Sequence, residues 1–475
     1  MENKTKITFY SGLDTIGAVI MEVRYGNSRA FFEAGTAYNP AFDMFDGGVK
    51  SRKNFISDHI WLNDIPKIDG VYRREDIPDK YPDLISAEDF EIDNQAFFIT
   101  HMHLDHMGMM GMISPDVTVY LSEPAQRLEF ALEEVGLGVE SIRNREYTDM
   151  EDITYVGEIM VRRFIINDDS YQDYSFYIET PDLKIHHTGD VFVYGKYREN
   201  MLKEIAFLQE QKIDILFCEG TRFFSNLDPE DFKEHPITPS FEPKDGLITK
   251  ARLDERITET LQNYDGLVIF NYYEREMSDV MHFSDYATAA NREIVYEPES
   301  AHLINRFFHK PVTVMLPDTY AKEPEYLEDI IASNKIITKD EVLLHPRDFL
   351  VQNTYPNSLE LLDYRNTKTL YLHHSGIPLG DYDPKNQRLR KLIEKCNMDY
   401  QKTYEGTDGY FSPHAETFQI LAYIEMVGAK LLVPVHTQNR RALLANVHCP
   451  SYYATLREVY TYNRKENTLE VVDHV

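Results

Sequence analysis

The residues best suited to chemistry are gathered in the segment ITHMHLDHMG, which follows a short apolar run. It contains His101, His103, Asp105 and His106, spaced as His-x-His-x-Asp-His. Side chains two positions apart on an extended chain point the same way, so His101 and His103 are expected to grip one metal ion. The following turn is expected to direct Asp105 and His106 to a second ion. Imidazole and carboxylate suit Zn²⁺, Mn²⁺ or iron, and the spacing favours a metal site over a histidine-rich surface loop.

Two further segments end an apolar run with a ligand-type side chain. Asp190 closes IHHTGD, where a carboxylate can bridge two metal ions, and His436 follows LLVPV. On its own, TGD is more often a turn, and a lone histidine after a buried strand is often a packed core residue. Because the His-x-His-x-Asp-His segment already indicates a metal site, Asp190 and His436 are both predicted to be metal ligands. His186 and His187 are expected to pack beside the site.

These side chains must be positioned by strands that end near one another. Strands are predicted in KITFYS, GAVIMEVRY, SRAFFEAG, QAFFITH, DVTVYLS, DYSFYIET, LKIHHTGD and DILFCEGT. The segment LDHMGMMGMI is expected to form a helix, and SEPAQRLEFALEEVG a second one that begins at Ser122 and stops at Gly136. Residues 36–92 are mostly polar, with several Pro and Gly, and predict an irregular insertion that covers the site.

The pattern changes after Thr221. Expected helices (DERITETLQNY and DYATAANREIVYEP) alternate with apolar strands (GLVIFNYY, KPVTVMLP and KTLYLHH), which predicts a parallel, Rossmann-like layer. The segment SPHAETFQILAYIEMVGAKLLVPVHTQNR then indicates a helix, a glycine stop and a buried strand. We therefore predict one domain made of residues 1–222 and 403–475, interrupted by an α/β insert at 223–402.

The bulk composition narrows the function classes. With 475 residues, 43% hydrophobic and 27% charged, the chain is typical of a globular protein of two or three domains. No apolar run reaches membrane-spanning length, and MENKTKITFYSG does not resemble a secretory signal. Three distant cysteines indicate a reduced, cytoplasmic setting. The net charge of −30 counts weakly against a nucleic-acid substrate.

Together these segments resemble the metallo-β-lactamase superfamily and, within it, the β-CASP group of ribonuclease J and the 3′-end-processing endonucleases. FFEAG resembles the first motif, with Glu33 where Asp is usual, THMHLDHMG the second and HTGD the fourth. EGT with Glu219, SPHAE with His414 and PVHTQN with His436 resemble motifs of the β-CASP branch. The resemblance spans nearly the whole chain. It implies an α/β chain with the four-layer αββα fold, interrupted by a Rossmann-like β-CASP insert.

One departure concerns the third motif, which in the family carries a metal-binding histidine. The corresponding stretch is INDDSYQDYSFYIET, and counting back from IET places Asp168 where the histidine is expected. Asp169 is adjacent and could serve instead. A carboxylate makes this site more anionic, which favours Mn²⁺ over Zn²⁺ in activity. A degraded and weakly occupied first site is the alternative.

The resemblance implies a hydrolase with two divalent metal ions, Zn²⁺ or Mn²⁺, and no organic cofactor. It places the nucleophile, a hydroxide, between the two ions, with Asp105 among the catalytic residues. His414 would protonate the leaving oxygen and Glu219 would orient the His414 ring. A phosphodiesterase or nuclease acting on RNA or single-stranded nucleic acid is the function predicted first. The alternatives are a hydrolase of a small-molecule phosphodiester or ester, and a non-catalytic partner protein. No membrane partner is expected, and a homo-oligomer is compatible with the sequence.

Overall fold

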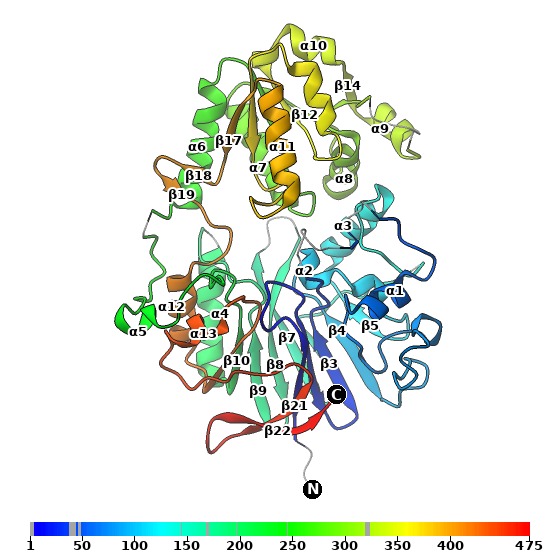
Figure 1. Cartoon of the computed structure of the whole chain (residues 1–475), viewed down its shortest axis with the longest axis vertical. Helices are drawn as coiled ribbons and strands as arrows, with labels where there is room; N and C mark the ends of the chain where they lie inside the picture. The colour runs from blue at the N-terminus through cyan, green and yellow to red at the C-terminus, as the bar shows by residue number, and fades with distance from the viewer. Residues whose placement is uncertain are drawn as a thin grey trace.

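The computed structural model describes residues 4–37, 44–45, 49–143, 145–167, 171–195, 197–244, 246–318 and 324–475. They form two lobes stacked along the long axis of the molecule (Figure 1). The sandwich lobe contains two facing β-sheets, and the insert lobe contains a third sheet with its own helices. None of the helices in these residues is long and apolar enough to cross a membrane.

The first sheet of the sandwich lobe joins the two ends of the chain. Its strand order is β22-β21-β1-β2-β3-β4-β5. β3, β4 and β5 run parallel to one another, so their carboxyl ends lie at the same edge. The bounds are β1 (Lys6–Ser11), β2 (Ile20–Tyr25), β3 (Ser28–Phe32), β4 (Asn94–Phe98), β5 (Thr118–Tyr120), β21 (Glu458–Asn463) and β22 (Thr468–His474).

The second sheet also takes in a distant part of the sequence. Its order is β20-β10-β9-β8-β7-β6, with β9, β10 and β20 adjacent and parallel. Three chain segments therefore leave this sheet at one edge. The bounds are β6 (Ile153–Val156), β7 (Ile159–Asn167), β8 (Asp173–Thr180), β9 (Leu183–His187), β10 (Ile215–Cys218) and β20 (Leu431–Pro434).

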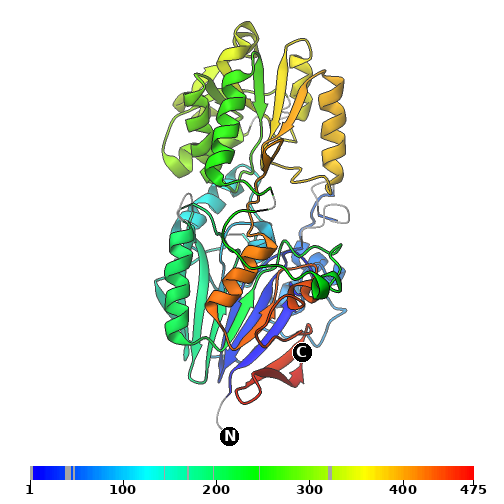
Figure 2. The same cartoon turned by 90° about the vertical axis from the view of Figure 1, so that its left-hand side faces the viewer.

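Helices cover both outer faces of this sandwich (Figure 1), and Figure 2 looks onto one of these faces, with its helices in front of the sheets. Within β3, Ala30 and Phe32 face the core between the sheets, whereas Phe31 faces the outer helices. One outer layer contains α1 (Phe55–Leu62), α2 (Leu104–Met107) and α3 (Glu123–Glu134). The other contains α4 (Tyr197–Gln211), α12 (Thr417–Val427) and α13 (Arg440–Leu444). The predicted mixed α/β fold with αββα layers is confirmed.

The insert lobe is built on a parallel sheet with the order β14-β13-β12-β15-β11-β16-β17. Its strands are β11 (Leu267–Phe270), β12 (Glu293–Tyr296), β13 (Thr313–Met315), β14 (Lys335–Ile337), β15 (Phe349–Gln352), β16 (Thr369–His373) and β17 (Asp399–Lys402). Its helices are α6 (Lys250–Asn263), α7 (Met277–Ala289), α8 (Pro298–Phe308), α9 (Leu327–Ser333), α10 (Lys339–Leu344) and α11 (Pro384–Lys395). The short elements α5 (Asp231–Glu234), β18 (Glu405–Gly406) and β19 (Gly409–Tyr410) lie in the segments that run between the lobes, and α5 itself packs on the sandwich lobe through Phe232.

Two element predictions need correction. DYATAANREIVYEP is not one helix, because α7 ends at Ala289 and β12 begins at Glu293. Asn291 has a φ of +51°, which a continuing helix does not allow, and the β-branched Ile294 and Val295 then pair in the sheet. LDHMGMMGMI forms one helical turn, α2, and a separate 3₁₀ turn. The predicted start of α3 is confirmed, since the Ser122 side chain accepts a hydrogen bond from the backbone N–H of Ala125 at 3.2 Å.

The two lobes are packed together through α3 and α8. The apolar core outside the first sheet continues into the insert lobe without a break. At its edge, the Arg306 guanidinium donates to Glu134 at 3.0 Å, and the Arg127 guanidinium lies over the Phe307 ring. The insert is therefore seated on the sandwich by buried apolar surface as well as by polar contacts.

A buried polar cluster lies between α4 and the second sheet. The Ser175 hydroxyl donates to Glu204, and His186 Nε2 lies 2.9 Å from the Tyr423 hydroxyl and 3.3 Å from Glu204 Oε1. Burial raises the pKa of Glu204 to about 7 and lowers the pKa of His186 to about 3. Near pH 6, therefore, both groups are neutral and the pair is not a salt bridge.

Glu204→Gln should change how stability depends on pH. Folded Glu204 keeps a proton that the unfolded chain releases above about pH 4.3, so its stabilisation is complete below that pH and is lost as the pH rises to about 7. Between pH 5 and pH 8 the variant should gain about 3 kcal/mol relative to wild type. The titration of His186 occurs in both proteins and cancels in the difference. Urea unfolding followed by fluorescence of Trp61, the single tryptophan, tests this, and identical pH profiles would contradict it.

Candidate metal centre

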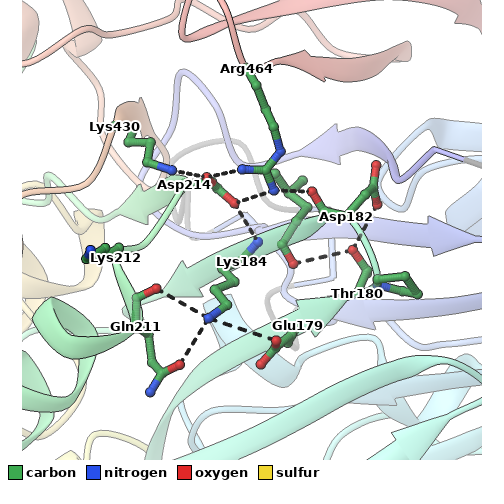
Figure 3. Close-up of a pocket in the computed structure, with 11 residues that line it drawn as sticks. Glu179, Thr180, Asp182, Lys184, Gln211, Lys212, Asp214, Lys430 and Arg464 are labelled. Carbon is green, nitrogen blue, oxygen red and sulfur yellow. Dashed lines mark hydrogen bonds and ion pairs between the residues drawn. The ribbon is translucent and has the colours of Figure 1, made fainter.

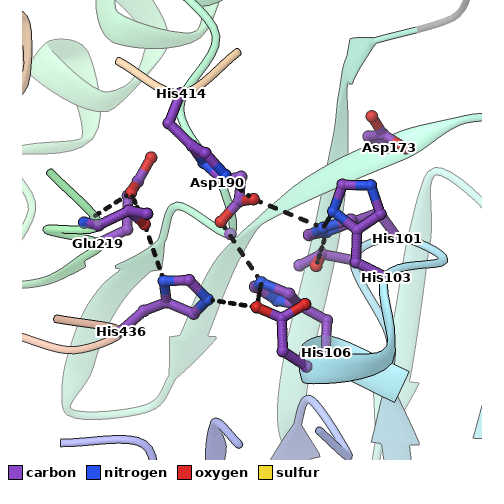
Figure 4. A network of polar contacts seen from close by, with 12 residues as sticks. His101, His103, His106, Asp173, Asp190, Glu219, His414 and His436 are labelled. Atoms are coloured by element: carbon purple, nitrogen blue, oxygen red, sulfur yellow. Dashed lines mark hydrogen bonds and ion pairs between the residues drawn. The ribbon is translucent and has the colours of Figure 1, made fainter. Parts of the chain in front are cut away.

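The ligand-type residues meet because several strands end at the same edge of the sandwich. Asp190 follows β9, Glu219 follows β10 and His436 follows β20, and these three strands are parallel neighbours. From the facing sheet, Glu33 follows β3 and His101 follows β4, again as parallel neighbours. The edge faces the insert lobe. Side chains from both sheets thus converge in one buried cluster (Figure 4).

His101, His103 and Asp190 form the first group of potential ligands. His101 Nε2 lies 3.1 Å from His103 Nδ1 and 3.6 Å from Asp190 Oδ2. Ligand atoms held tetrahedrally at about 2.05 Å from a zinc ion lie about 3.3 Å apart. The spacing therefore fits a metal ion bound by two histidines and a carboxylate, three of the four ligands predicted for this site, the fourth being Asp168.

Asp105, His106 and His436 form the second group. His436 Nε2 lies 3.1 Å from Asp105 Oδ2, and His106 Nε2 lies 3.9 Å from the same oxygen. His106 Nε2 is also 3.4 Å from Asp190 Oδ1. Asp190 thus turns one oxygen to each group, which is the arrangement of a bridging carboxylate.

Hydrogen bonds fix which ring nitrogen of each histidine faces the cluster. The Thr100 hydroxyl donates to Glu33 Oε1 at 2.6 Å, so it accepts from His101 Nδ1, 2.9 Å away. Glu33 Oε1 also lies 3.2 Å from His106 Nδ1. Both histidines therefore keep the lone pair of Nε2 for the cluster, which is what a metal ligand requires.

The same arrangement holds His436. The Thr221 hydroxyl donates to Glu219 Oε2 at 2.5 Å and accepts from His436 Nδ1 at 2.9 Å. Glu219 also accepts hydrogen bonds from the backbone N–H groups of Val191 and Thr221. Glu219 therefore acts on the His436 ring through Thr221, a link that the sequence did not indicate.

The charges around the cluster attract cations. Burial lowers the pKa of His106, but the carboxylates of Asp190, Asp105 and Glu33 outweigh it and raise the pKa well above its usual value. Burial raises the pKa of Asp190, yet the nearby histidines hold it well below its usual range. Buried carboxylates that stay ionised need positive partners, and divalent metal ions supply them.

The backbone is shaped to let these groups meet. Glu33 and His436 have φ values of +68° and +50°, in the left-handed region that costs a residue with a Cβ about 1 kcal/mol or more. Gly35, the glycine of FFEAG, passes the backbone of Asp105 so closely that a Cβ would lie 1.7 Å from its carbonyl oxygen. A glycine is therefore required beside this ligand, which gives the FFEAG motif a physical basis.

His414 lies at the open side of the cluster. Its Nδ1 is 3.4 Å from Asp190 Oδ2, and its side chain is 27% exposed. Ligand-type atoms of Asp190, Glu219 and His414 all lie within 4.8 Å of one another. The hydrogen bonds of Glu219 go to Val191 and Thr221 rather than to the His414 ring. The predicted proton donor is thus at the site, whereas the predicted orienting role of Glu219 has no hydrogen bond behind it.

The predicted ligand Asp168 and its neighbour Asp169 lie outside the described residues. The nearby described carboxylate is Asp173, which is 2% exposed and accepts a hydrogen bond from the Asn167 amide at 2.8 Å. Burial raises the pKa of Asp173 well above its usual value, with Glu276 as the next cause. Asp173 falls outside the ligand groups given above. It is a protonatable group near the site, at a position that the sequence did not indicate.

Two other charged features are poor alternatives. A cavity of about 220 Å³ lies where β8 turns into β9, at the opposite ends of these strands (Figure 3). Its Asp214 carboxylate is already paired with Lys430 and Arg464 at 2.7 and 3.0 Å. An acidic cluster in the insert lobe has Lys339 at its centre, donating to each of Asp318, Glu360 and Asp363. In both features, these carboxylates already pair with Lys or Arg side chains of the protein.

Comparison with solved structures supports the architecture. The chain is similar to the crystal structure of a protein of unknown function from Enterococcus faecalis V583, with 25% sequence identity, a TM-score of 0.74, and coverage of 96% of this chain and 100% of that one. An arrangement like that of this chain therefore exists in a protein solved by crystallography.

Metallo-β-lactamase fold proteins also match, over part of the chain. YhfI from Bacillus subtilis has 12% identity and a TM-score of 0.27, covering 48% of this chain and 76% of that one. BJP-1, a subclass B3 metallo-β-lactamase of Bradyrhizobium japonicum, has 13% identity and a TM-score of 0.26, covering 44% and 76%. At these identities and TM-scores, the two likenesses say nothing about the activity of this chain. No family model and no curated protein sequence matches the chain.

Proposed function

We propose that this chain is a metal-dependent hydrolase with two metal ions, and that the bond it cleaves is a phosphodiester. The observation that carries the proposal is Asp190, whose two oxygens face two separate groups of histidine and carboxylate ligands. Two divalent ions, Zn²⁺ or Mn²⁺, would supply Lewis acidity and a nucleophilic water at neutral pH when bound.

The side chains of the protein supply the remaining roles. His101 and His103 would hold one ion, and His106, His436 and Asp105 the other. His414 faces Asp190 from the open side, where its ring can deliver a proton to the leaving oxygen. Glu219 and Thr221 keep the His436 ring in place. A positioned acid beside two Lewis-acid sites suits a leaving group as poor as an alkoxide.

RNA or single-stranded nucleic acid is the first substrate candidate, because the insert lobe lies over the metal edge and could hold a strand there. A small-molecule phosphodiester or ester is the second candidate, and the charge of the site favours it. The carboxylates of Asp190 and Glu276 lie among the ligand histidines, 3.6 Å from His101 Nε2 and 2.7 Å from His103 Nε2, so negative charge stands where a polyanion would have to approach. Arg275, on the same loop as Glu276, is buried against Glu129 and is not offered to a polyanion.

The deciding experiment compares substrates on protein reconstituted with Zn²⁺ or Mn²⁺. Labelled RNA, labelled single-stranded DNA, bis(p-nitrophenyl) phosphate and a p-nitrophenyl carboxylic ester are incubated with the same preparation. Turnover of RNA or DNA that falls steeply with salt supports the first candidate. Turnover of the small phosphodiester alone supports the second. Metal-loaded protein that cleaves none of the four substrates would contradict the proposed activity.

The proposal also includes the cytoplasmic location that the sequence predicts.

His414→Gln should lower the turnover number by about 10²-fold or more while both metal ions stay bound. Glutamine keeps the size of the side chain but cannot deliver a proton near neutral pH. The loss should be small for a p-nitrophenol leaving group, which leaves without protonation, and large for an alkoxide. Turnover on both leaving groups, with metal content by mass spectrometry, checks this. Loss of one equivalent of metal would make His414 a ligand instead.

A further inference from the structure

The two ligand groups that flank Asp190 contain four histidines, which differ in the lobe that holds the outer nitrogen of each ring. His101 and His106 are held by Thr100 and Glu33, and His436 by Thr221. All of these partners belong to the sandwich lobe. His103 is the exception among them, since its Nε2 lies 2.7 Å from the carboxylate of Glu276, in the insert lobe.

Glu276 reaches His103 because its loop is fastened at several points. The loop leaves β11 and ends where α7 begins at Met277. Next to Glu276, the Arg275 guanidinium is 3% exposed and donates to Glu129 Oε2 and to the Leu137 carbonyl, both at 2.8 Å and both in the sandwich lobe. The Tyr171 hydroxyl, also in the sandwich lobe, donates to Glu276 Oε1 at 3.1 Å.

This contact fixes how His103 can bind a cation. A carboxylate at Nε2 keeps the ring proton there, so the lone pair of Nδ1 faces the cluster, 3.1 Å from His101 Nε2. It also orients the ring and makes Nδ1 a stronger donor to a metal ion. Swinging the insert lobe away would remove the carboxylate and leave the ring free to rotate.

We propose that Glu276 is a positioning residue through which the insert lobe completes the metal site of His101, His103 and Asp190, so that seating of the insert and metal binding strengthen each other. The inference rests on the proposed two-metal site and goes beyond it, since it makes one of the two sites depend on the arrangement of the lobes. In the other site, the hydrogen bonds that the described residues make to His106, His436 and Asp105 come from the sandwich lobe, so this site is expected to depend less on the insert.

The test measures metal binding in the full chain. Apo-protein is titrated with Zn²⁺ by calorimetry for wild type, Glu276→Ala and Glu276→Gln. Glu276→Ala should weaken one of the two sites by about 10- to 100-fold and leave the other unchanged. Glu276→Gln keeps the size of the side chain and a hydrogen-bond acceptor, so its Zn²⁺ affinity at this site should lie between those of wild type and Glu276→Ala. The control is Glu274→Ala, on the same loop but not in contact with the ligand histidines, and it should bind both ions as wild type does.

Hydrogen exchange provides the reciprocal measurement. If the coupling exists, Zn²⁺ must slow amide exchange in the loop 271–276 and in α7 of the wild type, and much less so in Glu276→Ala. Unchanged binding in Glu276→Ala, or equal weakening of both sites with a lower melting temperature, would overturn the inference and leave the proposed function intact. A wild type that binds no metal ion would instead overturn the proposed function.

Discussion

Replacing Asp190 by asparagine should reduce hydrolysis by about 10³-fold or more, the largest loss expected for a single site residue. Asp190 contributes one oxygen to each ligand group, at 3.6 Å from His101 Nε2 and 3.4 Å from His106 Nε2. Asparagine keeps the size but removes the charge and offers one oxygen instead of two. Both ions should therefore bind more weakly, and a shared carboxylate would no longer fix the distance between them.

The fold of the Asp190→Asn variant should survive, because the mutation also relieves a buried charge that only the neighbouring histidines and metal ions compensate. Activity, metal content and a circular-dichroism melt are measured together. Asp182→Asn is the matched control, since Asp182 lies at the other end of the same β8–β9 hairpin. It should keep full activity. An Asp190→Asn protein that retains both ions and wild-type turnover would show that Asp190 does not bridge a reactive centre.

The parts of the site that the sequence predicts are those encoded locally. His101, His103, Asp105 and His106 lie within six positions, and an apolar strand before them is enough to place them at a strand end. Asp190 and His436 were predicted as ligands because each follows an apolar strand. Nothing in the sequence, however, indicates that β9, β10 and β20 are neighbours. That order comes from the packing of the second sheet.

The parts that the sequence did not predict depend on contacts between distant segments. Glu276 touches His103 across 173 positions, and Thr221 touches His436 across 215. Glu276 also lies in a loop that follows an apolar strand, β11, so the same reasoning could have pointed to this loop. That Glu276 contacts His103, however, depends on how the insert lobe packs on the sandwich lobe. Similarly, helix propensity extended α7 too far, because the pairing of β12 with β15 overrides it.

Glu33→Ala should be the most destabilising change near the site, costing about 3 to 5 kcal/mol. Glu33 is fully buried, and its two oxygens accept from the backbone N–H and hydroxyl of Thr100, from His106 Nδ1 and from His187 Nε2, at 2.6 to 3.2 Å. Alanine leaves these donors without an acceptor and leaves His106 free to turn. Glu33→Asp keeps the charge and should cost less.

The penalty of Glu33→Ala should shrink in acid. Burial raises the pKa of Glu33, but His106 and the hydrogen bonds of His106 and His187 lower it well below its usual value. A carboxylate with a depressed folded pKa stabilises the protein above its unfolded pKa of about 4.3, and this stabilisation is lost as the pH falls further. Wild type and variant should therefore differ most near pH 7 and converge towards pH 3.

The measurement is urea unfolding of apo-protein, followed by the fluorescence of Trp61, which lies on α1 in the same lobe. The control Glu425→Ala, an exposed position on α12, should change stability by less than about 0.5 kcal/mol. If Glu33→Ala lowers stability equally at pH 3 and pH 7, its cost is a packing defect and Glu33 does not act through its charge. If the loss is confined to neutral pH and metal affinity falls with it, the same carboxylate that stabilises the sandwich lobe also aims His106 at the metal centre.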